Sequence, residues 1–271
     1  GFPYREGQGR FQATGRATGV NLFYAPGWPE LRGIETTFTF NGPAMQAFAS
    51  RGSIGGVAIT QAEAHSADLR DAIIAVRANA RADAGRTIRL LQASPLAPSF
   101  GTAFADLSGT GPVSGELVMY LPIKEFERRV VTVMATLDGV TLRHKTQPIE
   151  ATDVSGKLWV RNREIQAPAL TGRLLGGSVR ATIATTTQAN GNLDTQVNAQ
   201  GSVQGEPLRP IARLPVNAGL SGTANWRGFL TVERNADPAV PARGTLRLSS
   251  DLRGMASKLP EPFDKDADAA R

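Results

Sequence analysis

The chain has 271 residues, of which 41% are hydrophobic, 20% are charged and none is cysteine, and its formal net charge is +6. Without cysteine, disulfides, thiolate metal sites and cysteine nucleophiles are excluded. The arginines are scattered along the chain, and only Arg128 and Arg129 are adjacent. The sequence therefore shows no basic stripe of the kind that binds a phosphate backbone, and a nucleic-acid partner is not expected.

The composition predicts a mainly β chain, since 29 Gly and 17 Pro together with many Thr, Gln and Asn suit short strands and tight turns better than helices. Residues 1–17 are expected to be the trailing edge of a preceding repeat, and residues 20–24 a short strand. Residues 31–59 predict a three-stranded meander with a kink at Gly55 and Gly56. No apolar run approaches the roughly 20 residues that span a bilayer.

Two further segments follow the meander. Residues 68–81 could form a helix by propensity, but their counterpart at 193–203 could not, so both are predicted as strands. Residues 85–94 have apolar residues at helical spacing and a proline at their exit, which predicts a short helix; residues 206–214 repeat that pattern.

The pattern of the meander occurs twice. Val154 lies 120 residues after Ile34, and one inserted residue then sets Gly176 and Gly177 on the first Gly-Gly kink. Repetition at this period predicts tandem modules that stack into an elongated, twisted antiparallel β-groove with one short helix each. The modules are expected at residues 18–134 and 135–250, with the start of a third module and a frayed tail at 251–271.

The sequence offers little catalytic chemistry. His65 and His144 are the only histidines and stand among polar neighbours, and no zinc spacing, nucleophile elbow or phosphate-binding loop is present. The carboxylate pair Asp68 and Asp71 and the pair Glu125 and Glu127 lie beside basic residues, where carboxylates stay solvated and charged. We therefore predict no enzyme, no metal site and no cofactor.

The alternating strands carry the candidate site. Their apolar positions point to one face and their polar positions to the other. Two interpretations follow: a β-sandwich with a closed core, or one long sheet whose apolar face is uncovered and takes a partner such as acyl chains. On the second interpretation the apolar strip consists of Phe38, Phe40, Leu117, Met119, Leu121, Leu158, Val160, Leu246 and Leu248.

Several short motifs resemble the AsmA-like superfamily of bacterial envelope proteins, most closely its YhdP branch. They are PGWPELRGI from Pro26, FTFNGP from Phe38, ASPL from Ala93, LSGTG from Leu107, and SDLRGM from Ser250 with LPEP from Leu259. Their order along nearly the whole chain carries the resemblance. This family has no catalytic residues to transfer.

The resemblance implies a function and a place in the cell. It implies a periplasmic rod with a repeating β-groove that carries phospholipid towards the outer membrane. The full-length protein would be anchored in the inner membrane by an N-terminal helix that this chain lacks, and an outer-membrane or envelope protein could meet its far end. Two alternatives stay open: a structural or protein-binding envelope rod without lipid, and a polysaccharide-acting enzyme on a β-helix.

Overall fold

The computed structural model describes residues 11–24, 26–71, 73–94, 97, 105–209, 219–237, 240–260 and 264–269, with the side chains of residues 126 and 127 left out. It is mainly antiparallel β, as the sequence predicts. The strands are β1 (Gln12–Leu22), β2 (Leu31–Asn41), β3 (Ala44–Ile54), β4 (Val57–Ser66), β5 (Ile73–Asp83), β6 (Leu107–Thr110), β7 (Pro112–Pro122), β8 (Val130–His144), β9 (Glu150–Arg161), β10 (Glu164–Leu174), β11 (Gly177–Thr187), β12 (Leu193–Gln204), β13 (Ser221–Arg234), β14 (Arg243–Ser249) and β15 (Met255–Ala256). The helices are α1 (Ala84–Gln92), α4 (Gly205–Leu208) and the 3₁₀ helix η1 (Ile123–Arg128).

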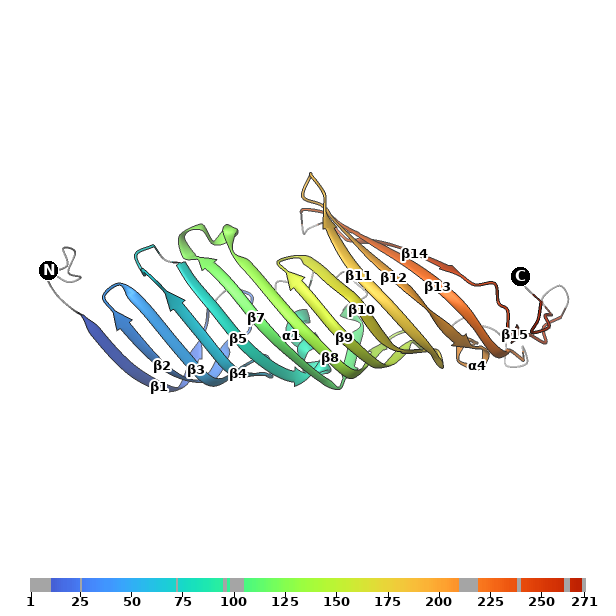
Figure 1. Ribbon diagram of the computed structural model, residues 1–271, viewed down its shortest axis with the longest axis horizontal. Helices are drawn as coiled ribbons and strands as arrows, with labels where there is room; N and C mark the ends of the chain where they lie inside the picture. The colour runs from blue at the N-terminus through green and yellow to red at the C-terminus, as the bar shows by residue number, and fades with distance from the viewer. Residues whose placement is uncertain are drawn as a thin grey trace. The chain divides into compact units, whose positions relative to one another are not determined.

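The strands form one open sheet. Hydrogen-bonded neighbours follow the order β1-β2-β3-β4-β5-β7-β8-β9-β10-β11-β12-β13-β14, with β6 on β8 and β15 on β13 (Figure 1). No second sheet packs on it within the described residues, so the sandwich interpretation is wrong for this part of the chain.

Contacts divide the chain into two compact units. Unit 1 comprises Gly1–Pro95, Val113–Ala135 and Trp159–Arg163, and unit 2 comprises Leu96–Pro112, Thr136–Leu158 and Glu164–Arg271. The module boundaries expected from the repeat stay a prediction.

The repeat is confirmed at the level of hairpins, but its expected register is wrong by one residue. Strand β10 begins and ends 120 residues after β3, without an insertion. Gly55 and Gly56 form the two-residue turn between β3 and β4, with φ of 55° and 83°, and Leu175 and Gly176 form the equivalent turn, with φ of 52° and 79°. Gly-Gly suits such a turn because both positions need positive φ.

Gly177 therefore opens β11 instead of sitting in the turn. A Cβ at Gly177 would collide with the carbonyl oxygen of Ser202 on the neighbouring strand β12. Close packing against β12 thus requires the second glycine of the Gly-Gly motif. The prediction assigned this glycine to the turn, and its register was therefore wrong by one residue.

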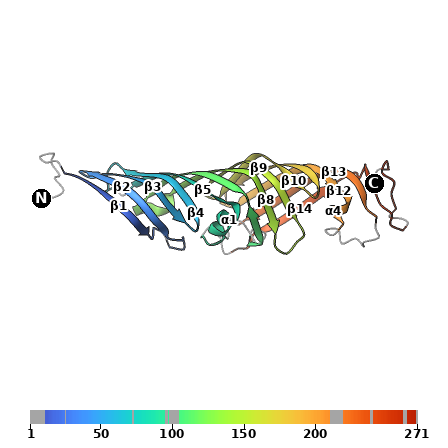
Figure 2. The ribbon, with the colours of Figure 1, turned by 90° about the horizontal axis from the view of Figure 1, so that it is seen from below.

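The helices agree in part with prediction. The helix expected at 85–94 is α1, which begins after Asp83; the carboxylate of Asp83 accepts a hydrogen bond from the Gly85 amide at 2.9 Å. It lies beside β4 and β5, where Leu90 packs against the Gly55 turn (Figure 2). The helix expected at 206–214 is shorter, since α4 ends at Leu208 and residues 210–214 lie outside the described residues.

The structure describes part of each chain end. The strand expected at 20–24 is the end of a longer strand, β1, which begins at Gln12; residues 1–10 lie outside the described residues. Residues 264–269 of the tail include hydrogen-bonded groups, and the expected fraying of the tail stays a prediction. The Lys265 amine donates to the carbonyl oxygens of Leu252 and Met255, each at 2.8 Å, and Ser257 bridges to Lys265 in the backbone.

The core is thin. Val140 is the largest fully buried side chain of the described residues. In unit 2, Val203, Ala224 and Met255 form a small buried cluster under α4 and β15. A single sheet with so little cover leaves most of both faces open to solvent or to a partner.

Candidate functional site

The apolar face of unit 1 carries a row of small side chains that crosses five strands. Register pairs join them one to the next, from β1 through β5. The row, called the alanine row here, consists of Ala17, Thr36, Ala49, Ala62 and Ala78. Because neighbouring strands are about 4.8 Å apart, the row is roughly 19 Å long.

Larger apolar side chains flank the alanine row on the same face. Phe38 pairs with Ala47 and Phe40 with Met45, two and four residues along their strands from the row. The two phenylalanine rings meet edge to face, with centroids 5.8 Å apart. The Phe38 ring occupies the space that a side chain at Gly15 would need, so this glycine allows the ring to lie flat across β1.

The orientation of β7 follows from an ion pair on the other face. Arg77 pairs in register with Glu63, opposite the apolar positions of β4 and β5, and its guanidinium lies 3.5 Å from the carboxylate of Glu116. Glu116 thus lies on the polar face, and alternation places Leu117, Met119 and Leu121 on the apolar face. The intervening Val118 and Tyr120 are 40% and 46% exposed.

Unit 2 has its own small-residue row. Ala181 pairs with Ala199, and Ala199 pairs with Gly228. Leu170 and Leu248 continue the row at its two ends. The next row along the strands is larger and fully apolar, and consists of Ala167, Ile183, Val197, Leu230 and Leu246.

Leu246 and Leu248 are the most open members of this face, at 60% and 66% exposure. Arg247, between them, pairs with Phe229 on the opposite face, as alternation along β14 predicts. Exposed leucines on a strand at the end of the sheet order are a surface that favours a partner.

Strand β9 presents the remaining predicted residues. A Cβ at Gly156 would meet the Leu170 side chain, and a Cβ at Gly172 would meet Val154, so the even-numbered positions of β9 share the face of Leu170. Leu158 and Val160 continue this alternation and are half-buried.

A polar line borders the apolar face of unit 2. The Arg234 guanidinium donates to the Thr195 hydroxyl at 3.1 Å, the hydroxyls of Thr195 and Thr185 lie 2.9 Å apart, and the Ile165 amide donates to Thr185 at 3.1 Å. All three side chains are buried, at 5%, 8% and 6% exposure for Arg234, Thr195 and Thr185. The buried cluster of Val203, Ala224 and Met255, with Trp226 beside it, closes the other end of these strands.

The predicted strip residues thus occupy apolar positions in the strands of both units; their arrangement into one continuous strip stays a prediction. The sequence interpretation missed the small residues between them. The sequence pattern that indicates these small residues is the alternation of alanine in AMQAFA from Ala44 and in AEAHS from Ala62. Alanine alone does not mark a binding site, so the prediction did not include them.

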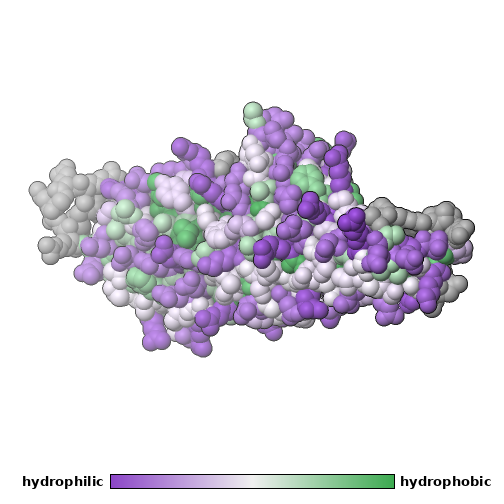
Figure 3. All heavy atoms as spheres, turned by 45° about the vertical axis from the view of Figure 1, so that its right-hand side comes forward, coloured by the Kyte–Doolittle hydropathy of each residue, from purple (hydrophilic) through white to green (hydrophobic). Residues whose placement is uncertain are grey.

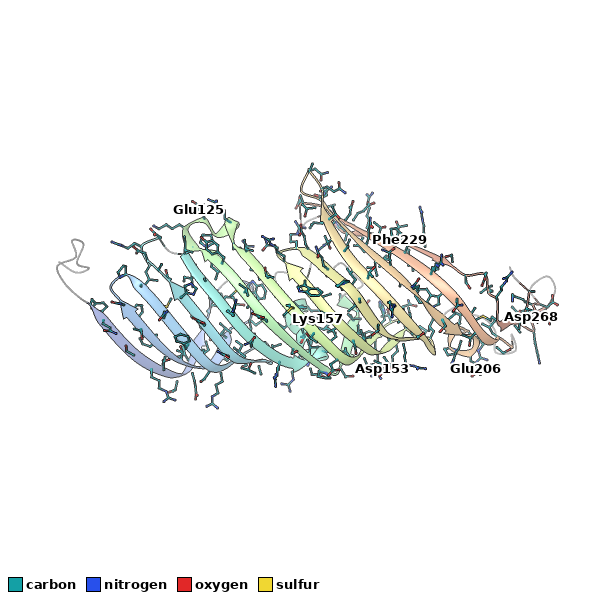
Figure 4. The ribbon with its side chains drawn as sticks, viewed as in Figure 1. Glu125, Asp153, Lys157, Glu206, Phe229 and Asp268 are labelled. Atoms are coloured by element: carbon teal, nitrogen blue, oxygen red, sulfur yellow. The ribbon has the colours of Figure 1, made fainter. Side chains whose placement is uncertain are left out.

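The opposite face carries charged residues such as Glu63 and Arg77, but also the exposed apolar side chains Val118 and Tyr120. In the view of Figure 3, hydrophilic residues predominate and apolar residues lie among them. Lys157 lies on β9, and Glu125 lies in η1, which follows β7 (Figure 4). Arg70 hydrogen-bonds to the carboxylate of Asp68 and holds its pKa at about 2, well below its usual value. Glu125 pairs with Arg128 at 2.7 Å. These carboxylates are charged surface groups, as the sequence predicts.

The described residues contain no cluster of three or more potential metal ligands. In the described part of the chain, no helix combines the length and the apolar composition that crossing a membrane requires.

An open antiparallel sheet of repeated hairpins, with rows of apolar residues on one face, defines a repeat β protein. The chain belongs to the YhdP family: the family described as YhdP protein matches residues 1–271. It is 23% identical over 271 residues to the intermembrane phospholipid transporter YhdP of Escherichia coli (strain K12). This match covers 98% of the present chain and 21% of the relative. The chain thus spans about a fifth of that relative. No solved structure matches the chain.

Proposed function

We propose that the chain is a section of a lipid transporter that carries phospholipid acyl chains along the apolar face of its sheet. The alanine row of unit 1 is the observation that carries this proposal. Five small side chains in register form a row that runs across the strands, with Phe38 and Phe40 beside it on β2. The name of the Escherichia coli relative, an intermembrane phospholipid transporter, supports phospholipid as the cargo.

Acyl chains suit such a surface for a physical reason. Burial of apolar surface is non-directional and contributes roughly 25 cal/mol per Å², so a chain is held without fixed contacts and can slide. No catalytic group is needed for this function, in agreement with a family of transporters.

In the full-length protein, the section would lie in the periplasm between the inner and outer membranes. An N-terminal anchor would hold the protein in the inner membrane, and an outer-membrane or envelope protein could receive the far end. The intermembrane activity of the relative supports this placement.

Native mass spectrometry of the purified chain tests the cargo. We expect co-purified phospholipid, released by detergent. A chain that never carries lipid, even after incubation with phospholipid vesicles, would favour the structural or protein-binding rod instead.

Charge on the predicted strip tests the path. The substitution Met119→Asp or Val160→Asp should block lipid crosslinking, because a carboxylate on the apolar face retains water where an acyl chain must lie. Asp at Thr39 or Arg247, on the opposite face, should leave crosslinking unchanged. If the Met119 and Val160 variants crosslink to lipid as well as the Thr39 and Arg247 variants do, and all four have unchanged circular dichroism, the proposed path is contradicted.

A further inference from the structure

The polar face of unit 2 is hollowed between β11 and β14. The hollow has a volume of about 580 Å³. Its lining includes three arginines, two amide side chains and one aromatic ring, namely Arg180, Arg227, Arg247, Asn198, Gln200 and Phe229. The rest of the lining is Thr182, Ser249, Ala199, Gly228 and Leu248. The hollow lies on the face opposite the apolar rows, since Phe229 and Arg247 pair with each other and alternate with Leu230 and Leu246 (Figure 4 labels Phe229).

The lining residues form two register rows across the strands. Gln200 pairs with both Arg180 and Arg227 and so stands between the two guanidiniums. Phe229 pairs with both Asn198 and Arg247 in the next row. One row of the hollow thus has two guanidiniums, and the next row has an aromatic ring beside the third guanidinium.

The three arginines have one carboxylate nearby, that of Asp251, which lines a neighbouring hollow together with Arg180 and Arg227. In the residues that the structure describes, none of them forms an ion pair, and all three are exposed. Elsewhere the chain does pair its arginines with carboxylates, as at Arg32, Arg51, Arg70, Arg77, Arg128 and Arg143. Three unpaired guanidiniums around one hollow produce a local positive potential that favours an anionic ligand.

The spacing and the chemistry of the rows restrict the ligand. Arg180 and Arg227 are two strands apart, which is about 9.6 Å, whereas side chains on one face of an extended peptide repeat at about 6.8 Å. A sugar polymer with one carboxylate per disaccharide repeats its charge at close to the first interval. The amides of Asn198 and Gln200 can bond sugar hydroxyls, and the Phe229 ring can pack on the C–H face of a sugar.

A second hollow extends the surface. It has a volume of about 1030 Å³ and shares Arg180, Gln200 and Arg227 with the first. Its one carboxylate, Asp251, already accepts a hydrogen bond from the Arg253 amide at 3.1 Å. The shared lining suits a polymer longer than a single sugar.

We propose that this surface, the arginine hollow, binds an acidic polysaccharide that carries about one carboxylate per disaccharide. Such a site would attach the section to an anionic glycan network by its polar face, while its apolar face is free for acyl chains. The inference goes beyond lipid carriage and does not depend on it.

Hyaluronan hexasaccharide is a suitable probe, since it has one carboxylate per disaccharide. The intact chain should bind it at about 0.15 M salt, where exposed charges are screened beyond about 8 Å. Arg227→Gln should weaken binding about fivefold or more, through loss of a charge-assisted bidentate contact. Phe229→Ala should weaken it about threefold or more with no change of charge.

Arg16→Gln is the matched control, because it removes the same charge from an exposed position on β1, in unit 1. It should change the affinity less than about 1.5-fold, as expected for a distant screened charge. Neutral chitohexaose should not compete with hyaluronan. Phe229 is half-buried, so the affinity of the Phe229→Ala variant is compared with that of the unmodified chain only if their thermal stabilities are equal. Arg227 is exposed, so its substitution should not affect folding and tests the hollow independently.

Several results would overturn the proposal: no binding of hyaluronan, equal loss in Arg16→Gln and Arg227→Gln, or binding of polyglutamate as tight as that of hyaluronan. The last result would identify the hollow as a surface for an acidic protein segment. Lipid crosslinking on the apolar face should be unchanged in Arg227→Gln, so failure of the glycan site and failure of lipid carriage are distinguished.

Discussion

A carboxylate in the alanine row should stop lipid from occupying unit 1. Ala62 is an inner member of that row, paired with Ala49 on one side and Ala78 on the other. The substitution Ala62→Asp puts a charge on the proposed lipid path. The control Ala58→Asp makes the same change on the same strand, at an exposed position that pairs with Arg81.

The expected effect can be worked from the strand spacing. A hydrated carboxylate excludes an acyl chain over about one strand spacing, roughly 4.8 Å or about four methylenes. Each methylene gains about 0.8 kcal/mol when fully buried and about half of that on an open face, so the loss is ~1.6 kcal/mol. Lipid occupancy should therefore fall by more than about tenfold.

The assay is photocrosslinking of phospholipid to a probe at Ala47, beside the row on the adjacent strand. Ala58→Asp should crosslink as the unmodified chain does, because its carboxylate faces solvent on the polar side. If Ala62→Asp retains full crosslinking while its circular dichroism is unchanged, the alanine row is not the path of the lipid.

Three further predictions concern stability and are read from urea or thermal unfolding. Gly177→Ala should cost about 3 kcal/mol because the Ser202 carbonyl occupies the site, whereas Gly244→Ala, where a Cβ would meet its nearest neighbour at 4.0 Å, should be nearly neutral. Asp83→Ala should cost about 1 kcal/mol by removing the cap of α1; a cost near zero would show that the cap is not needed. Asp68 has a lowered pKa of about 2, so its small contribution is present above the unfolded pKa near 4 and lost as the pH falls towards 2; Asp68→Asn should remove that part of the acid dependence.

The sequence predicted the strands and hairpins well because alternation and turn residues are local signals. The helix before Pro95 was located within two residues, and the meander expected at 31–59 begins as predicted at Leu31. Its third strand, β4, continues to Ser66, where the sequence predicted the meander to end at residue 59. The register at Gly177 could not be predicted, because that glycine is fixed by the approach of Ser202 on β12, which lies more than twenty residues later.

The site was predicted only in its large residues. Periodicity marked Phe38 and Met119 as members of one face, but it did not indicate that the intervening alanines form a row, since rows depend on the register of five strands. The arginine hollow was missed for the same reason. Its three arginines are far apart in the chain, and only the pairing of strands brings them to the same hollow.

The evenness of the alanine row bears on how a lipid would move. If acyl chains lie on this row, a shift by one strand, roughly 4.8 Å, sets each methylene over another small side chain. Four of the five members are alanine and the fifth is threonine, so the buried area changes little along the path. Since the free energy of burial follows the area, the chain would meet only small barriers along the row. The bulky Phe38 and Phe40 lie beside this path instead of across it, where they can confine a chain sideways without obstructing its movement.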